Sequence, residues 1–392
     1  MLTAQHIETV KSTIPVIEQG GVAITDHFYN RVFTHHPELK NVFNMSHQET
    51  GTQRVALFEA ILAYAKNIDD LSPLKSAVER IAHKHTSFHI QPEHYAVVGH
   101  NLIETFRELL GDAFTPDIEE AWGQAYQVLA DIFINREEEL YQDSESKKGG
   151  WRGKRAFRIA EKTPESELVT SFVMVPVDEQ SVCDFSPGQY IGIELRSNKL
   201  QYTEIRQYSL SDHSNNQSYR ISVKREGSDP KGIASNFLHD EIHVGAIVDL
   251  YAPAGDFYLQ DNDSPIVLIS AGVGATPMQS MLEDLNQRNY SHPVHYVHAC
   301  HNQDQHSFHK HNQSICEENS WSYDIWYSDV VEGSHAHQGY IDLTNQAIPI
   351  DKGDFYLCGP VAFMAYIKEH LIALGVSDER IHYEVFGPHA SL

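Results

Sequence analysis

The stretch 143–150, DSESKKGG, divides the chain into two parts with different hydrophobic patterns. It is polar, ends in paired glycines and has no periodicity, which is typical of a linker. Before it, apolar residues recur with the 3.6-residue period of amphipathic helices. One such stripe consists of Val55, Phe58, Leu62 and Ala65. We therefore predict an all-helical domain over residues 1–142, followed by a linker over residues 143–150.

After Trp151 the pattern changes to short alternating strands between Gly, Pro and Asn turns, which predicts an antiparallel β-barrel over residues 151–260. From Pro265, apolar strands precede helical patterns, as IVLIS (266–270) precedes MQSMLEDL (278–285). This alternation is typical of an α/β domain with a parallel sheet, predicted over residues 261–392. The expected fold is therefore multidomain: all-α, then a β-barrel, then parallel α/β.

Composition excludes several classes of partner. The 392 residues include 54 acidic and 29 basic side chains, a net charge of −25, which disfavours nucleic acid and anionic lipid. No apolar run reaches the roughly 18 residues of a membrane span. The four cysteines form no CxxC pair, which favours a reducing cytoplasm. We expect a cytoplasmic monomer, although the sequence does not determine the oligomeric state.

His85 is distinguished from the other histidines by its position on a predicted helix. In KSAVERIAHKHTSF (75–88) it continues an apolar stripe, whereas His83 lies off that stripe and His89 follows the helix end. The stripe consists of Val78, Ile81, Ala82 and His85. We expect His85 to be the one imidazole that faces inward. A structural core histidine and a metal ligand both fit this position.

The surroundings of His85 favour a ligand. Gln53 and Leu57 are four residues apart and share a helix face, and Tyr29 lies on an earlier helix. The segments that carry a family resemblance are FYNRVFTHHPELKNVFNMSHQETGTQRVALF (28–58), IAHKHTSFHI (81–90) and AWGQAYQVLADIFINREEELY (121–141). Through them the helical part resembles the globin domain of bacterial flavohaemoglobins.

The resemblance implies a haem b site. In it His85 is the proximal iron ligand, and Tyr29 and Gln53 are hydrogen-bond donors on the distal side. The remaining implied positions are Phe43 and Leu57 in the distal wall, and Tyr95 and Glu137 beneath the iron. A carboxylate bonded to the proximal imidazole raises its basicity and favours chemistry on dioxygen over reversible storage.

Three segments of the barrel resemble the FAD-binding barrel of the ferredoxin-reductase family: PGQYIGIEL (187–195), EIRQYSLS (204–211) and KGIASNFL (231–238). Tyr190 and Tyr208 are aromatics suited to stacking on a flavin, and Arg206 suits its diphosphate. Gly232 precedes a helix start whose free N–H groups suit phosphate. The implied FAD-binding residues are Tyr190, Arg206, Gln207, Tyr208, Ser209, Gly232, Ser235 and Asn236.

The last domain contains two glycine turns after apolar strands, in PIVLISAGVGATPMQSMLEDL (265–285) and FYLCGPVAFM (355–364). Pro277 stands where a dinucleotide fingerprint would have its third glycine. Both segments and the terminal HYEVFGP (382–388) resemble the NAD(P)H domain of the same reductases. The implied nucleotide- and flavin-binding residues are Gly272, Val273, Gly274, Ala275, Thr276, Pro277, Cys358, Gly359, Pro360, Phe386 and Gly387. Lys84 and Glu384 resemble residues that this family places between flavin and haem.

The combined resemblance covers nearly the whole chain and implies a nitric oxide dioxygenase. Electrons would pass from NAD(P)H through FAD to the haem iron, where O2 and NO are converted to nitrate. Two alternatives remain: a dioxygen or NO sensor globin with an iron-reducing flavin module, and a ferric or flavin reductase. Residues 261–392 hold five basic and 17 acidic side chains, so we expect NADH to be preferred. His298 or His301 could attract NADPH below neutral pH.

Seven histidines lie in SHPVHYVHACHNQDQHSFHKH (291–311). No carboxylate or cysteine pair completes a metal-ligand set there at a recognisable spacing. The sequence therefore leaves open whether this loop binds a metal.

Overall fold

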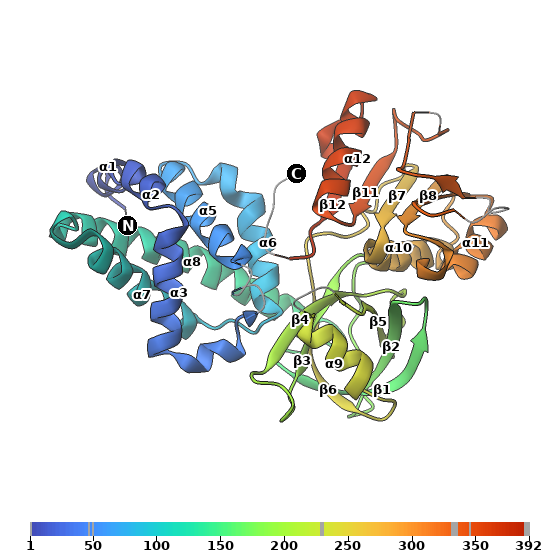
Figure 1. The fold of residues 1–392 in the computed structure, drawn as a ribbon, viewed down its shortest axis with the longest axis horizontal. Helices are drawn as coiled ribbons and strands as arrows, with labels where there is room; N and C mark the ends of the chain where they lie inside the picture. The colour runs from blue at the N-terminus through green and yellow to red at the C-terminus, as the bar shows by residue number, and fades with distance from the viewer. Residues whose placement is uncertain are drawn as a thin grey trace. The chain divides into compact units, whose positions relative to one another are not determined.

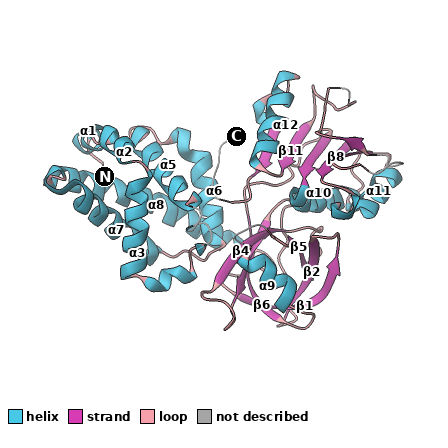
Figure 2. Cartoon of the chain, viewed as in Figure 1, coloured by secondary structure: helices cyan, strands magenta, loops and turns pink. Residues whose placement is uncertain are grey.

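The computed structural model describes residues 2–45, 48, 51–227, 231–330, 336–344 and 346–387. They form two compact units. The first comprises residues 1–146, 151–153 and 194–206, and the second comprises residues 147–150, 154–193 and 207–392. The described helices before residue 147 all belong to the first unit, and the described strands follow them in the chain. Figure 2 shows which segments are helices and which are strands. Among the described residues, no helix is long and apolar enough to cross a membrane.

The first unit is built from helices around one apolar core (Figure 1). Its helices are α1 (Ala4–Ser12), α2 (Ile14–Gly20), α3 (Val22–His35), α5 (Thr52–Lys66), α6 (Lys75–Thr86), α7 (Pro92–Leu110) and α8 (Pro116–Ser146). Short 3₁₀ turns lie at Pro37–Asn41, Ser72–Leu74 and Gly111–Ala113. The core includes fully or nearly fully buried Phe28, Val32, Phe106 and Trp122. Helix α8 brings residues near its C-terminal half next to α6, where His85 lies.

Two details of the helical prediction are wrong. Helix α8 continues to Ser146, so the first half of the predicted linker is helical, because neither glycine nor proline occurs before Gly149. Val55, placed on the inner stripe of its helix, is 41% exposed. The buried face of α5 instead contains Ile61, Tyr64 and Ala65.

After the helices, the chain forms a six-stranded sheet whose strand order is β4-β3-β6-β1-β2-β5. The strands are β1 (Arg155–Pro164), β2 (Val169–Pro176), β3 (Tyr190–Leu195), β4 (Glu204–Ser209), β5 (Tyr219–Lys224) and β6 (Ile247–Ala254), with helix α9 (Ile233–Glu241) before β6. An isolated antiparallel bridge joins Leu210, directly after β4, to Ile221 of β5. The two ends of the sheet therefore approach one another, as the barrel prediction requires.

The rest of this unit is a parallel sheet of strand order β10-β9-β8-β7-β11-β12. Its strands are β7 (Ile266–Ala271), β8 (Val294–Cys300), β9 (Ser322–Tyr327), β10 (His337–Gln338), β11 (Asp354–Cys358) and β12 (Ile381–Glu384). Helices α10 (Ala275–Gln287) and α11 (His309–Glu318) share one apolar core with the sheet, and α12 (Val361–Ala373) shares another. Burial on two faces explains the continuous apolar strands.

Candidate functional site

The His85 imidazole is held by residues from two other helices. Its Nδ1 lies 2.7 Å from a carboxylate oxygen of Glu137 on α8 and 2.9 Å from the phenol oxygen of Tyr95 on α7. The Tyr95 hydroxyl also donates to Glu137, which is 2% exposed. The carboxylate therefore accepts from both neighbours and fixes the ring orientation.

The second nitrogen of His85 has a different environment. Its Nε2 has no hydrogen-bond partner among the residues that the structure describes, and the side chain is 33% exposed. A ring with Nδ1 bonded to a carboxylate and Nε2 available is the arrangement expected of a metal-ligating histidine. The residues present thus fit an iron at Nε2.

Two neighbouring histidines test the helix-phase argument. Helix α6 ends at Thr86, and His89 has a positive φ of 56° beyond it, as expected. However, the His83 side chain is 15% exposed, less than the 33% of His85, and its Nε2 lies 3.2 Å from the Glu79 carboxylate one turn earlier. The expectation that His85 alone faces inward is therefore wrong. What distinguishes His85 is the carboxylate at Nδ1.

Tyr29 lies in an aromatic cluster in the core of the helical unit. Its ring centroid is 5.1 Å from that of Phe28 and 5.8 Å from that of Phe43, and its side chain is 3% exposed. Burial raises the pKa of Tyr29 to about 12, although the nearby amides of Gln53 and Gln48 act in the opposite direction. The phenol therefore stays protonated at neutral pH and is available as a donor. Leu57 packs against the same core.

Gln48 is a candidate that the sequence did not reveal. It is 3% exposed and lies close enough to the Tyr29 hydroxyl to lower the pKa of that phenol, yet neither its Oε1 nor its Nε2 makes a well-aligned hydrogen bond with a described group. A buried amide without partners is costly, so a further polar ligand near Tyr29 would stabilise it. This observation fits a site for a small ligand beside Tyr29. No sequence signal marked Gln48, because it lies in a polar stretch without periodicity.

In the barrel, glycines define the surroundings of the predicted flavin residues. Gly255 has φ +121°, and a Cβ there would lie 3.0 Å from the Tyr190 ring. Gly232 precedes α9, whose first turn has no side-chain cap. The Ser235 hydroxyl and the Asn236 amide both donate to the Gly232 carbonyl. These two side chains therefore hold the turn, while its N–H groups suit a phosphate.

Arg206 is not an isolated charge on its strand. Its Nη2 lies 2.5 Å from the Glu204 carboxylate, and its Nη1 donates to the Ile205 carbonyl. Gln207, Tyr208 and Ser209 follow on β4. A phosphate at this position would share Arg206 with Glu204, which lowers the gain expected from the arginine alone.

The structure brings the two predicted nucleotide turns together. Strands β7 and β11 pair in parallel with Ser270 opposite Cys358, so residues 272–277 and 358–360 meet at one sheet edge. A Cβ at Gly274 would lie 2.2 Å from the Cys358 carbonyl oxygen, and only glycine permits this approach. Such an edge is where open α/β sheets bind ligands. The Val273 carbonyl accepts from Thr276, and Ala275 and Pro277 are buried in the first turn of α10.

The C-terminal segment leaves the sheet at the same edge. Glu384 ends β12 opposite Cys358, whose thiol lies 3.6 Å from the Glu384 carbonyl. Phe386, two residues later, is 47% exposed, and Gly387 has φ +142°. The placement of Lys84 and Glu384 between flavin and haem stays a prediction, as does the contact of Phe386 with a flavin.

The histidine-rich stretch forms a buried imidazole stack. The ring centroids of His298 and His306 are 4.7 Å apart, and those of His306 and His309 are 4.5 Å apart. Their nitrogens bond to hydroxyl groups of Ser270, Tyr323 and Tyr327. Burial lowers the pKa of His298 to about 3. This low pKa disfavours the suggested positive charge on His298 below neutral pH.

Comparisons with known proteins agree with this three-part organisation. Residues 26–133 match the globin family, residues 156–258 match the oxidoreductase FAD-binding domain, and residues 268–369 match the oxidoreductase NAD-binding domain. A flavohemoprotein of Vibrio cholerae is 56% identical over the full length of both chains. The chain belongs to the flavohaemoglobin family.

Solved structures place this flavohaemoglobin chain in the same family. It superposes on the flavohemoglobin of Malassezia yamatoensis, solved with bound FAD and heme, with a TM-score of 0.87 at 29% identity. That match covers 98% of this chain and 100% of the fungal one. The FAD/NAD-binding domain of the V. cholerae nitric oxide dioxygenase matches 60% of this chain and 99% of its own, with 50% identity and a TM-score of 0.58. The expected fold class and the expected haem, FAD and nicotinamide cofactors are confirmed.

Proposed function

We propose that this flavohaemoglobin is a nitric oxide dioxygenase that detoxifies NO by converting NO and O2 to nitrate, with NADH as the preferred electron donor. The bond between His85 Nδ1 and the buried Glu137 carboxylate carries the proposal. Such a bond makes the imidazole a stronger electron donor, which favours reaction of dioxygen over its storage. The FAD and NAD domains fit this role as a supply of electrons.

The chemistry that the bound cofactors supply is distinct from the part that the protein's own side chains play. When bound, haem supplies an iron that takes O2, and FAD converts hydride transfer into single-electron transfer. On the proximal side, Glu137 and Tyr95 hold the His85 ring, leaving Nε2 for the iron. On the distal side, the Tyr29 hydroxyl can donate a hydrogen bond to a bound ligand. The side-chain amides of Gln53 and Gln48 lie near this hydroxyl. The aromatic rings around Tyr29 exclude water.

The relatives support the same activity, since the V. cholerae domain that is 50% identical belongs to a protein named nitric oxide dioxygenase. All four cysteines are free in the structure, and we keep the cytoplasm as the proposed location. The competing functions make different demands. A sensor globin needs no continuous electron supply, whereas a ferric or flavin reductase oxidises NADH whether or not NO is present.

The decisive experiment measures nitrate formed per NADH oxidised when NO is added to the FAD- and haem-loaded protein. Electron balance for nitrate formation from NO and O2 requires about two nitrates per NADH. We expect this ratio in air and no nitrate without O2. NADH oxidation that is indifferent to NO would support the reductase, and a single turnover followed by arrest would support the sensor.

Tyr29→Phe tests the distal donor in the same assay. A hydrogen bond to an acceptor that carries charge contributes roughly 1.5 to 3 kcal/mol. Losing it should speed O2 release about 10- to 100-fold, since 1.4 kcal/mol corresponds to about a tenfold change. Stopped-flow O2 dissociation measures this rate. An unchanged rate would transfer the donor role to an amide of Gln53 or Gln48, which Gln53→Leu and Gln48→Leu would distinguish.

A further inference from the structure

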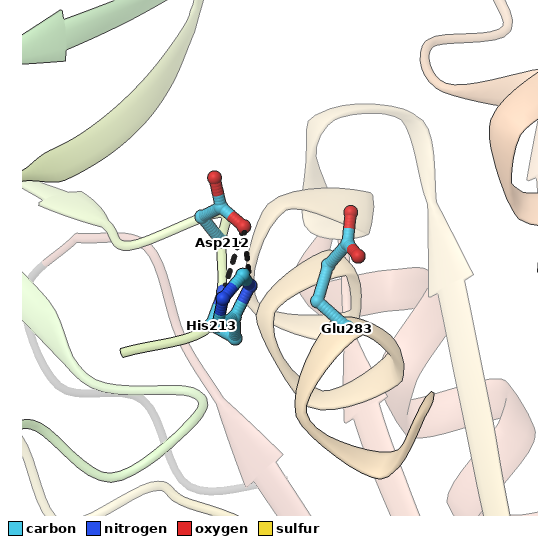
Figure 3. A group of neighbouring side chains, drawn as sticks. All are labelled: Asp212, His213 and Glu283. Atoms are coloured by element: carbon cyan, nitrogen blue, oxygen red, sulfur yellow. Dashed lines mark hydrogen bonds and ion pairs between the residues drawn. The ribbon is translucent and has the colours of Figure 1, made fainter. Parts of the chain in front are cut away.

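Three side chains with metal-binding atoms meet in the second unit, and a histidine lies beside one of them. Asp212 and His213 lie in the segment after β4, Glu283 is on α10, and His311 is on α11. The ligand atoms of Asp212, His213 and Glu283 lie within 4.8 Å of one another (Figure 3). This is the one such group among the described residues. His311 adds a fourth donor, because its Nε2 lies 2.7 Å from Glu283.

The segments that carry these ligands are tied together. The Ser280 hydroxyl of α10 donates to the Asp212 carbonyl at 2.8 Å, and Ser280 is one turn before Glu283 on the same helix face. The Gln279 amide donates to Glu283 at 3.0 Å and orients its carboxylate. The geometry of the group therefore depends on hydrogen bonds beneath the ligands, as in functional metal sites.

A second observation points to a ligand that the protein atoms do not provide. Gln279 is fully buried, and its Oε1 has no hydrogen-bond partner among the described groups. Its amide is directed toward Glu283 through Nε2. A buried acceptor without a donor is costly. A water on a metal ion held by Glu283 would supply the missing donor.

The charge of the cluster is compatible with a cation. Two carboxylates face one guanidinium, that of Arg220, whose nitrogens lie 3.6 Å from Asp212 and 3.7 Å from Glu283. Arg220 is held elsewhere, because its Nε donates to the Ser211 carbonyl and its guanidinium lies over the Phe308 ring. With both imidazoles neutral, as metal ligation requires, the two carboxylates exceed the single guanidinium in charge, and a divalent ion would neutralise that excess.

We propose that Asp212, His213, Glu283 and His311 form a binding site for a divalent transition metal, with Zn²⁺ as the preferred ion. Two imidazoles and two carboxylates suit Zn²⁺, whereas Mg²⁺ and Ca²⁺ require oxygen ligands. The ion would link the segment after β4 to α10 and α11, and so join the barrel to the nucleotide domain. The site is independent of the proposed dioxygenase activity.

Equilibrium dialysis of the full chain, loaded with haem and FAD, against chelator-buffered Zn²⁺ tests the proposal. We expect one Zn²⁺ bound more tightly than all others, unaffected by excess Mg²⁺. His213→Ala and Glu283→Gln should each weaken its apparent affinity by at least about 10-fold. Arg220→Gln should strengthen it, since a like charge is removed. FAD content and NADH-driven ferricyanide reduction verify that each variant is folded.

The chain offers a matched control for adventitious binding by its histidines. His292 bonds to the Asp263 carboxylate at 2.5 Å and is about as exposed as His213, but it belongs to no group of three ligands among the residues that the structure describes. His292→Ala should leave the tightest Zn²⁺ unchanged. Zinc-edge X-ray absorption should show imidazole and carboxylate ligands at about 2.0 to 2.2 Å. Equal affinity in wild type and His213→Ala, or equal losses in His213→Ala and His292→Ala, would overturn the proposal.

Discussion

His85 in the helical unit and the stacked histidines in the nucleotide domain have opposite hydrogen-bonding environments. His85 Nδ1 bonds to the carboxylate of Glu137. His298 Nδ1 bonds to the Ser270 hydroxyl, and His306 Nδ1 bonds to the Tyr327 hydroxyl. A carboxylate stabilises positive charge on an imidazole, whereas buried hydroxyl partners do not, and burial lowers the pKa of both His298 and His306. His85 therefore differs from the stacked histidines in the partner of Nδ1 as well as in burial, and the carboxylate partner fits the iron ligand that we propose.

The largest expected effect is that of removing His85. His85→Ala should lose haem and NO consumption, because no other described imidazole of α6 has a carboxylate at Nδ1 and a free Nε2. FAD content and NADH-driven ferricyanide reduction should persist, since they depend on other domains. Haem content and NO electrode traces measure the outcome, with His83→Ala as the matched control. Normal haem content in His85→Ala would make His83 or His89 the ligand and would contradict the inference that the carboxylate at Nδ1 marks His85 as the iron ligand.

Glu137→Gln tests the carboxylate while keeping its size. Haem should remain bound, but a neutral amide leaves the imidazole a weaker electron donor. Loss of such a partner typically costs 10- to 100-fold in affinity or activity, so we expect roughly that decrease in NO consumption. Resonance Raman spectra should show a lower iron–histidine stretching frequency. Glu138→Gln is the control, because Glu138 pairs with Arg152 on the protein surface. Equal spectra for wild type and Glu137→Gln would remove the electronic role of the carboxylate.

The buried histidines predict a loss of stability in acid. The folded pKa of His298 is about 3, below the usual 6.5, so its stabilisation is complete above pH 6.5 and is lost as the pH falls toward 3. Each such group gives a slope of about 1.4 kcal/mol per pH unit in this window. Urea unfolding from pH 6.5 to 4.5 measures the slope. His298→Asn should be less stable at pH 7.5 but should have a shallower slope. Parallel curves would mean that His298 is protonated in the folded state.

The difference between these histidines also shows how far sequence reasoning reaches. The hydrophobic pattern of the sequence, which changes across residues 143–150 and again near Pro265, predicted the three kinds of domain. It could do so because hydrophobic periodicity indicates which faces of an element are buried. The same periodicity misjudged His83 and Val55, since it describes a helix without the side chains packed against it. The bond from His85 to Glu137 joins residues 52 positions apart, and periodicity contains no information about such a pair.

The site residues that local sequence patterns could not predict are those brought into contact from distant segments of the chain. The burial of Gln48, whose amide makes no well-aligned hydrogen bond with a described group, follows a polar sequence that gives no sign of it. The group of Asp212, His213 and Glu283 combines a barrel segment with a helix of the nucleotide domain. His311 was visible in the histidine-rich stretch, but its partner Glu283 lies 28 residues earlier, on another helix. Only the tertiary fold brings these atoms together.

The smallest expected effect concerns the choice between NADH and NADPH, which depends on whether the histidines of the nucleotide domain are neutral. The 2′-phosphate of NADPH needs a cation nearby. In the nucleotide domain, Arg288 pairs with Asp261 and Asp284, and Lys368 pairs with Asp378. Repulsion of about 1 kcal/mol, typical of exposed charges, would favour NADH by about 5-fold in kcat/KM.

The dependence of the NADH preference on salt and pH distinguishes an effect of the buried His298 from an effect of the exposed His301. The KM for NADPH should rise as salt is lowered, because screening of the acidic field weakens. Lowering the pH from 7.5 to 6 should not relieve the preference through His298, whose pKa is about 3. Steady-state kinetics with both nucleotides, at two salt concentrations and two pH values, measure this, and His301→Ala is the control for the exposed histidine after β8. A weaker preference for NADH at pH 6 that persists in His301→Ala would show that a buried imidazole accepts a proton. Equal kcat/KM values for NADH and NADPH would show that charge does not control the choice of nucleotide.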